Sequence, residues 1–263
     1  MKHLSTMIFS LFIALLLVAD SFALIEAITK PDADILLSFV RGGRVSNVLV
    51  TEGQRVNAGQ LLAKLEDTAE RLQLQQLKEK AADKIRINMV DIELAQKQED
   101  LQKMEAAKLD GAITMMEVEH ARLEVETSRL SKQMAEFERK QLGLQRDELE
   151  ARVKQLSLKS PISGQVEEIV IEVGEAAEPL SPVIRIVKID PLLIDAQVPL
   201  NQAKTLVNKQ VVRIPFPEGA IMDGVVQNVS AVADAASDTL RVRIKVNNKE
   251  RRPAGERVQL QFQ

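Results

Sequence analysis

Apolar positions along the chain follow three patterns, and each pattern predicts a different kind of structure. Residues 43–65 and 164–186 carry short β-branched runs punctuated by glycine, which are typical of small strands and tight turns. Residues 68–155 contain no proline and are rich in Glu, Lys, Gln, Leu and Ala, all of which favour helix. From residue 190 onward, apolar and polar residues alternate over several short runs, which indicates strands.

The two glycine-punctuated segments are copies of one motif, offset by 121 residues. Gly43 and Gly53 of the first copy correspond to Gly164 and Gly174 of the second. We expect both glycines of each copy to allow turns with positive φ. A unit of about 25 residues is too small to bury a core alone. The sequence therefore predicts one compact β-sandwich built from two half-motifs.

Residues 68–155 are predicted to form an antiparallel helical hairpin inserted between the half-motifs. In a heptad count from Ile113, one set of positions is apolar throughout and a second set is mixed, which is typical of a two-stranded coiled coil. The apolar set is Met116, Leu123, Leu130, Phe137, Leu144, Ala151 and Leu158. Asp110-Gly111 interrupts the pattern midway and predicts the reversal. Each arm of ~40 residues would be ~60 Å long.

The C-terminal third of the chain predicts a small β-barrel. Residues 240–246 alternate strictly between apolar and charged side chains, as a strand with one buried face does. Pro253-Ala254-Gly255 predicts a turn before a last strand at 257–262. About four to six short strands with one small helix favour a barrel.

Residues 1–23 have the layout of a secretory signal peptide. A short basic segment precedes an apolar run at 4–18, and Ser21-Phe22-Ala23 places small residues at the −3 and −1 positions of a cleavage site. An uncleaved membrane anchor is the alternative, but the apolar run is shorter than the ~20 residues that a spanning helix needs. We expect cleavage before Leu24.

Composition excludes several functional classes. The chain of 263 residues has no cysteine, so it has no disulfides, thiolate chemistry or cysteine zinc sites. Its two histidines, His3 and His120, cannot build a histidine-rich metal site. A net charge of −3 and an aromatic content of 3 % give no sequence-wide attraction to nucleic acid. We expect a protein that is not an enzyme, holds no cofactor or metal and binds no nucleic acid.

The order of these segments resembles that of the periplasmic adaptor, or membrane fusion protein, family of tripartite efflux pumps (HlyD-like). The resemblance is carried by residues 43–67, by Ser160-Pro161-Ile162-Ser163-Gly164, and by the strand and turn of the last segment, at 239–247 and 253–255. It covers nearly all of the chain after the expected signal peptide.

The resemblance implies an elongated α+β fold with three parts. A biotinyl/lipoyl-like β-sandwich, made of residues 24–67 and 156–188, is split by an antiparallel α-helical coiled-coil hairpin at 68–155. A small β-barrel domain follows at 189–263. A biotin or lipoyl carrier shares the β-fold, but a carrier presents a modified lysine in the turn where this chain has its hairpin.

The resemblance also implies a non-catalytic adaptor in the periplasm, associated with the inner membrane through its transporter. Its partners would be an inner-membrane transporter of the RND type, an outer-membrane channel protein and further copies of itself in a ring. The family's channel contacts cluster at the hairpin tip, which here contains Lys103, Ala107, Gly111, Ala112, Ile113, Thr114 and Glu117. Lys103, Ala107 and Thr114 stand where the family commonly has Arg, Leu and Ser.

Two other functions fit the same sequence. The chain could be an adaptor of an ABC-type or of a protein or peptide secretion system. Adaptors of the secretion type usually have an uncleaved cytoplasmic N-terminus and much longer coils. The chain could also be a coiled-coil structural protein that works without a pump.

The N-terminal pattern makes a direct prediction about processing. We expect the mature protein to begin at Leu24, because small residues precede that position. The intact mass of protein taken from a periplasmic extract measures this. A mass that retains residues 1–23 would contradict cleavage and favour the anchor.

Overall fold

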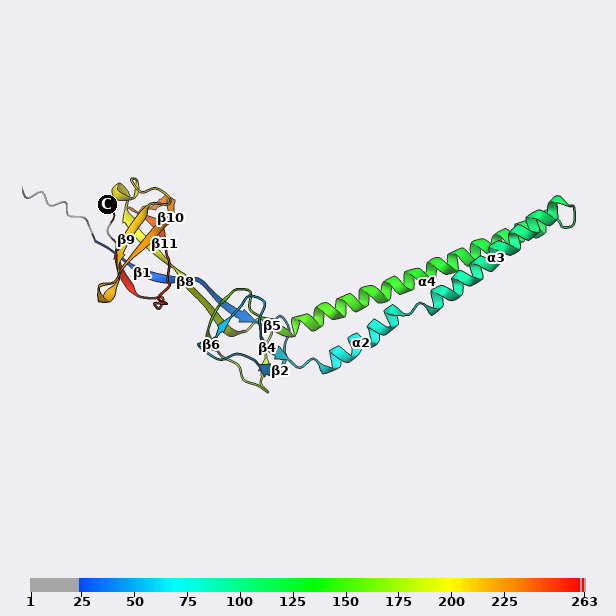
Figure 1. Ribbon diagram of the computed structural model, residues 1–263, viewed down its shortest axis with the longest axis horizontal. Coiled ribbons are helices and arrows are strands. Elements are labelled where there is room, and N and C mark those ends of the chain that lie inside the picture. Colours follow the sequence, from blue (N-terminus) through cyan, green and yellow to red (C-terminus); the bar gives the residue numbers. More distant parts are fainter. Residues whose placement is uncertain (1–23, 261, 263) are drawn as a thin grey trace, which may run out of the picture.

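The computed structural model describes residues 24–260 and 262, and these residues form an elongated molecule of three parts (Figure 1). A small β-barrel lies at one end, a second β-domain lies in the middle, and a long helical hairpin projects away from both (Figure 1). The expected signal peptide, residues 1–23, lies outside the described residues. The elements of the two β-domains are β1 (Ile25–Ser38), β2 (Gly43–Val48), β3 (Arg55–Val56), β4 (Leu61–Leu65), β5 (Ser157–Lys159), β6 (Gly164–Ile169), β7 (Ala176–Ala177), β8 (Pro182–Pro199), α5 (Leu200–Ala203), β9 (Val211–Pro215), η1 (Pro217–Gly219), β10 (Ile221–Asp234), β11 (Thr239–Val246) and β12 (Arg257–Leu260).

Two long strands, β1 and β8, connect the β-domains. They pair antiparallel from Thr29 to Ser38, with a register shift between Pro31 and Ala33. Before Thr29, β1 pairs instead with the last strand, β12. Both strands therefore run from the barrel into the middle domain. The barrel takes its first strand from residues that our expected boundaries place in the first half-motif, because a strand's partners depend on contacts far away in sequence.

The barrel sheet follows the order β12-β1-β8-β11-β10-β9, and its outermost strands, β9 and β12, lie near each other. Its core contains Leu192, Ile194, Ile244 and Leu260, all fully buried. Gly224 is required inside it, because a Cβ there would lie 2.5 Å from the Cδ1 atom of Ile214. The predicted small β-barrel is confirmed.

In the middle domain, strands of one sequence copy pair with strands of the other. β2 pairs with β7, and β3 pairs with β6. The two copies share one core, in which Val45, Leu62, Val166 and Ile186 are buried together. Each copy thus supplies the partner strands that the other lacks.

The repeat glycines have two different roles. Gly53 and Gly174 have the expected positive φ, +80° and +95°. The expectation was wrong for Gly43 and Gly164. These glycines begin strands β2 and β6, and neither has a positive φ. Gly164 is needed for close packing instead, because a Cβ there would lie 2.5 Å from the carbonyl oxygen of Val187. At Gly43 a Cβ would make ordinary contact, at 3.4 Å, with Leu65.

The hairpin consists of α2 (Thr68–Ala82) and α3 (Ile85–Leu109) in one arm and α4 (Met115–Gln155) in the other. The 41 residues of α4 correspond to a rod of about 60 Å. The first arm is interrupted at Asp83, whose backbone is extended and whose carboxylate accepts a hydrogen bond from the N–H of Ile85 at 2.7 Å. Among the described residues, no helix has the length and apolar character to cross a membrane.

The two ends of the hairpin meet at the middle domain. The N–H of Leu65 donates a hydrogen bond to the carbonyl oxygen of Leu156 at 2.8 Å, so the chain leaves and re-enters at the same place. Asp67 is buried beside this junction, and it pairs with Lys64 at 2.7 Å and with Arg71. Burial raises the pKa of Asp67, but the two cations outweigh it and hold that pKa below its usual value.

This closure makes the hairpin separable from the β-core. We expect a variant with residues 68–155 replaced by a short turn to fold, because the paired copies keep their core and the ends already lie together. Circular dichroism should show loss of most helix with a cooperative thermal transition retained. Complete loss of cooperative unfolding would contradict the independence of the β-core.

Candidate functional site: the hairpin tip and its outer face

The tip is a rigid reversal that is built by two helix caps. At the end of α3, Gly111 has a φ of +76°, and Ala112 donates its N–H to the carbonyl oxygen of Ala107 at 3.0 Å. A glycine at this position and this bond are the features of a Schellman motif. At the start of α4, Thr114 and Glu117 form a capping box, in which the Thr114 N–H donates to the Glu117 carboxylate at 2.7 Å. This backbone bond holds the pKa of Glu117 below its usual value.

The structure places the sequence-predicted tip residues in different environments. Gly111 permits the reversal as expected, and Ala112 is exposed. Lys103 is exposed on α3 and pairs with Glu99 at 2.8 Å, while Ala107 is half-buried.

Ile113, which the resemblance places among the channel contacts, is half-buried. It precedes the N-cap of α4, and an apolar residue there typically packs on the fourth residue of the helix, which is the buried Val118. The exposed apolar side chains of the tip are instead Leu109, which is 88 % exposed, Met115 and Met116. Sequence reasoning missed them, because their periodicity suits an inner face equally well.

The face of α4 that packs inside the hairpin also differs from the prediction. The buried residues of α4, called the inner seam, are Val118, Ala121, Val125, Ser128, Ala135, Leu149 and Val153. Small side chains recur in this seam every seven residues, at Ala121, Ser128 and Ala135. Small residues allow two helices to approach closely, and they are poor markers of burial in a sequence. The heptad count from Ile113 therefore selected the larger residues and the wrong face.

The residues predicted to form the coil seam lie on the outside of the hairpin. An outer stripe on α4 consists of Met116, Leu123, Leu130, Met134, Phe137 and Leu144, which are 55–81 % exposed. Of the remaining predicted seam residues, Ala151 is exposed and Leu158 is buried in β5 of the middle domain. A stripe of large apolar side chains with heptad spacing is the surface that a further helix would cover.

A shorter outer stripe lies on α3 and contains Ile85, Met89 and Ile92, which are 61–74 % exposed. Ion pairs between the arms show which residues of α4 lie opposite this stripe. Arg86 pairs with Glu138, and Asp91 pairs with Lys132 at 2.7 Å. The α3 stripe therefore lies level with Leu130, Met134 and Phe137 of the α4 stripe.

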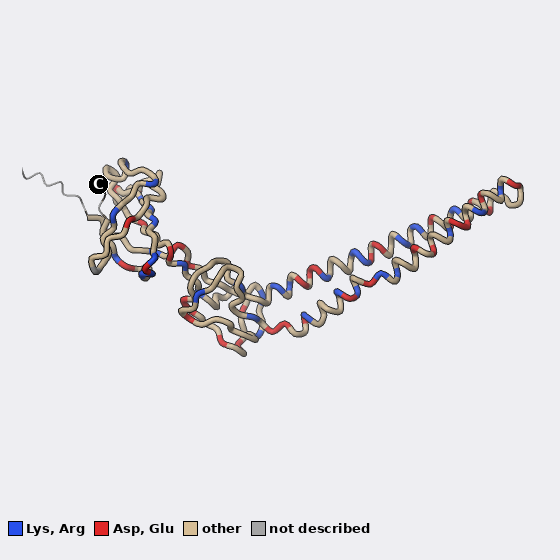
Figure 2. The backbone as a smooth tube through the Cα atoms, viewed as in Figure 1, with Lys and Arg blue, Asp and Glu red and all other residues tan. Residues whose placement is uncertain are grey.

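Basic and acidic residues are interspersed along both arms of the hairpin (Figure 2). Nearer the tip, Lys97 pairs with Glu124 at 2.7 Å, and Arg122 pairs with Glu105 at 2.8 Å. The hydrogen bond between Lys97 and Glu124 raises the pKa of the lysine and lowers that of the glutamate. Exposed pairs of this kind contribute little stability, so they mark the register of the two arms, which the buried inner seam holds.

A shallow groove of about 430 Å³ opens beside the tip. Its lining residues are Met104, Met116, Glu117, His120, Ala121 and Glu124. Both carboxylates of the groove are already engaged, Glu124 with Lys97 and Glu117 in the cap of α4, so the two methionines are the surface that it offers to a partner helix. In the described part of the chain, no group of three or more His, Asp or Glu side chains could hold a metal ion.

Comparison with known proteins agrees with this architecture. Residues 191–263 match the family model for the CusB-like β-barrel domain. The chain superposes on MacA from Actinobacillus actinomycetemcomitans with a TM-score of 0.78 at 14 % identity, covering 92 % of this chain and 78 % of MacA. It superposes on the membrane fusion protein Spr0693 from Streptococcus pneumoniae R6 with a TM-score of 0.60 at 14 % identity, covering 92 % of this chain and 98 % of Spr0693. The chain has the fold of the membrane fusion proteins.

A third similar structure carries a transplanted hairpin. It is a MacA–MexA chimera with the α-hairpin domain of Pseudomonas aeruginosa MexA, and it matches with a TM-score of 0.55 at 14 % identity, covering 92 % of this chain and 81 % of the chimera. No curated protein sequence matches this chain. The resemblance that the sequence shows to membrane fusion proteins is thus confirmed in the fold.

The two faces of α4 predict opposite responses to the same substitution. Val125→Asp should destabilise the hairpin by about 3 kcal/mol, because it buries an unpaired charge in the inner seam. Leu130→Asp, on the outer stripe, should change the stability by no more than about 0.5 kcal/mol. Thermal unfolding of each variant, followed by helical circular dichroism, measures the difference. Equal destabilisation by both changes would contradict the assignment of the inner seam.

Proposed function

We propose that this protein is a non-catalytic adaptor that links an inner-membrane efflux transporter to an outer-membrane channel. The observation that carries the proposal is a hairpin of about 60 Å whose capped tip exposes large apolar side chains. The fold of the membrane fusion proteins and the signal-like residues 1–23 support a place in the periplasm. The adaptor would be held at the inner membrane by its transporter.

The tip is proposed as the surface that meets the channel. Leu109, Met115 and Met116 present apolar area at the far end of the hairpin, and Lys103 and Glu117 add charge beside it. A partner built of helices could continue the packing of α3 and α4 beyond the reversal. The predicted docking set is retained, except that Leu109 and Met116 replace Ile113 as its main apolar contacts.

The opposite end, the barrel, is proposed to rest on the transporter. Val211 and Val225 are cross-strand partners on β9 and β10, and both are exposed, as is Ile221. Exposed apolar pairs on a sheet face are typical of a contact surface. An RND-type pump is the transporter that the sequence resemblance implies, and an ABC-type or protein secretion system is the alternative.

Copies of the chain are proposed to stand side by side in a ring. The outer stripe of α4 and that of α3 lie on different helices but at the same height, so the α3 stripe of one copy can meet the α4 stripe of the next. Contacts between two different surfaces of identical subunits generate a ring when the rotation closes. This arrangement would cover the apolar side chains that a single hairpin exposes.

Photo-crosslinking in cells tests the adaptor role without knowledge of the exported substrate. We expect a crosslinking residue at Leu109 to capture an outer-membrane channel protein and one at Phe137 to capture a second copy of this chain. Mass spectrometry of the adducts identifies each partner. A crosslinking residue at Leu72, which is exposed on α2 far from the tip, serves as the control.

The outcomes separate the two parts of the proposal. Capture of a second copy at Phe137 without any outer-membrane protein at Leu109 would contradict channel docking and leave a self-associating coiled-coil protein. Capture of the channel at Leu109 without homotypic adducts at Phe137 would contradict the proposed ring contact. Capture of the same partners at Leu72 would show that neither contact is specific.

A further inference from the structure

A cleft lies between the middle domain and the barrel, beside the β1–β8 strands that connect them. It has a volume of about 490 Å³, in the range of small-molecule sites. The middle domain contributes Arg55, Asn57 and Ser163, β8 contributes Lys188 and Asp190, and the barrel contributes Lys249 and Arg251. We call this space the cationic cleft.

The charges that line the cleft are unbalanced. Four of its lining residues are cations, while Asp190 is its one carboxylate among the described residues. Lys188 is neutralised by Asp32 at 2.7 Å, but no ion pair of the described residues engages Arg55, Lys249 or Arg251. The cleft thus keeps an excess of positive charge, since these three cations are opposed only by Asp190, in a chain whose net charge is −3. Converging cations of this kind attract an anion with more than one negative charge.

The neighbouring cavity, of about 500 Å³, does not share this imbalance. It contains Arg185, but the guanidinium of Arg185 is paired with both carboxylate oxygens of Asp34, at 2.6 and 2.8 Å. Glu167 also lines this cavity. The excess of positive charge is therefore confined to the cationic cleft.

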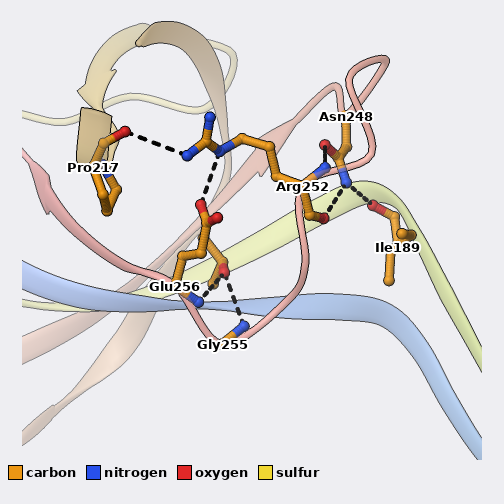
Figure 3. Close-up of polar contacts among 7 residues, drawn as sticks. Ile189, Pro217, Asn248, Arg252, Gly255 and Glu256 are labelled. Atoms are coloured by element: carbon orange, nitrogen blue, oxygen red, sulfur yellow. Dashed lines mark hydrogen bonds and ion pairs between the residues drawn. The ribbon is translucent and has the colours of Figure 1, made fainter. Parts of the chain in front are cut away.

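The loop that carries Lys249 and Arg251 is held in place by a buried polar network (Figure 3). Asn248 is 1 % exposed, and its amide nitrogen donates to the carbonyl oxygens of Ile189 and Arg252 at 2.8 and 2.9 Å. Its amide oxygen accepts the Arg252 N–H at 2.9 Å.

Contacts on either side of Asn248 complete this network. The Asn248 N–H donates to the Asp190 carboxylate at 2.9 Å. Further along the loop, Arg252 donates to Glu256 at 2.8 Å, and the Thr29 hydroxyl accepts the N–H groups of Gly255 and Glu256 (Figure 3). Because these hydrogen bonds hold the loop, Lys249 and Arg251 extend from a fixed backbone. Less conformational entropy is then lost when a ligand binds.

The backbone of Arg251 is a second sign that its position is specified. Its φ is +60°, in the left-handed region that residues with a Cβ rarely adopt. Arg251 lines both cavities, at the point where the barrel faces the middle domain. Strained residues of this kind cluster at ligand-binding positions.

We infer that the cationic cleft binds a phosphorylated ligand with two or more negative charges. Arg55 from the middle domain and Lys249 and Arg251 from the barrel would hold it from opposite sides. Because the two domains contribute separate cations, a bound anion would join them and narrow the range of angles between them. This inference does not depend on the proposed channel or ring contacts.

Calorimetric titration of the purified full-length protein with pyrophosphate tests the site. We expect binding that weakens with added salt, and we expect the triple variant Arg55→Gln, Lys249→Gln, Arg251→Gln to weaken it about tenfold or more. The matched control is Lys204→Gln, Lys209→Gln, Arg241→Gln, which removes the same charge from exposed residues outside the cleft. Equal loss of binding in both triple variants would show general charge attraction and overturn the site.

A parallel arm distinguishes a free phosphate compound from a lipid headgroup. Vesicles that contain cardiolipin, whose headgroup carries two phosphates, and vesicles of phosphatidylcholine alone are tested for co-sedimentation with the same variants. Binding to pyrophosphate supports a free phosphate compound, and cleft-dependent binding only to the anionic vesicles supports a headgroup. Binding to neither overturns the proposal.

The effect on the domains is measured separately by distances between spin labels. The chain has no cysteine, so labels at Lys159→Cys and Val232→Cys report the middle domain and the barrel without background. We expect the distance distribution to narrow with the ligand that binds. An unchanged distribution at saturation would overturn the clamping of the two domains.

Discussion

The pairing of β1 with β8 is the constraint on which the rest of the molecule depends. These strands belong to both β-domains, so the barrel and the middle domain share continuous backbone rather than meeting through a flexible linker. Ion pairs line the shared strands, with Asp34 bound to Arg185 and Asp195 bound to Arg243. The hydrogen bonds to these arginines hold the pKa of each aspartate below its usual value. Both charge pairs therefore persist until the solution becomes strongly acidic.

Local sequence was sufficient to predict the parts of the fold that depend on local physics. The two copies could be recognised from glycines that recur 121 residues apart. Gly53 and Gly174 recur because each copy has a turn with positive φ at that position, which glycine adopts easily. The composition of residues 68–155 marked the helices, and Asp110-Gly111 marked the reversal. The barrel strands followed from strict alternation. These features require only that a residue suit its own backbone and its own exposed or buried face.

The parts that were missed depend on contacts between distant segments. Ala121, Ser128 and Ala135 are small because α3 approaches them, which the sequence of α4 alone does not record. The start of β1 joins the barrel only because β12 lies beside it. The same reasoning explains Gly164, whose missing Cβ leaves room for Val187. At the tip, caps place Ile113 inward, and residues that looked like an inner seam lie outside.

The interruption at Asp83 makes the two arms of the hairpin mechanically unequal. One arm is a single unbroken helix, while the other has an extended residue where the ladder of helical hydrogen bonds stops. When a sideways force acts on the tip, the broken arm can shorten or lengthen at that point, and the continuous arm resists as a bending beam. The hairpin should therefore flex in one preferred plane, at a fixed height about a third of the way from its base, without any change in the packing at its far end.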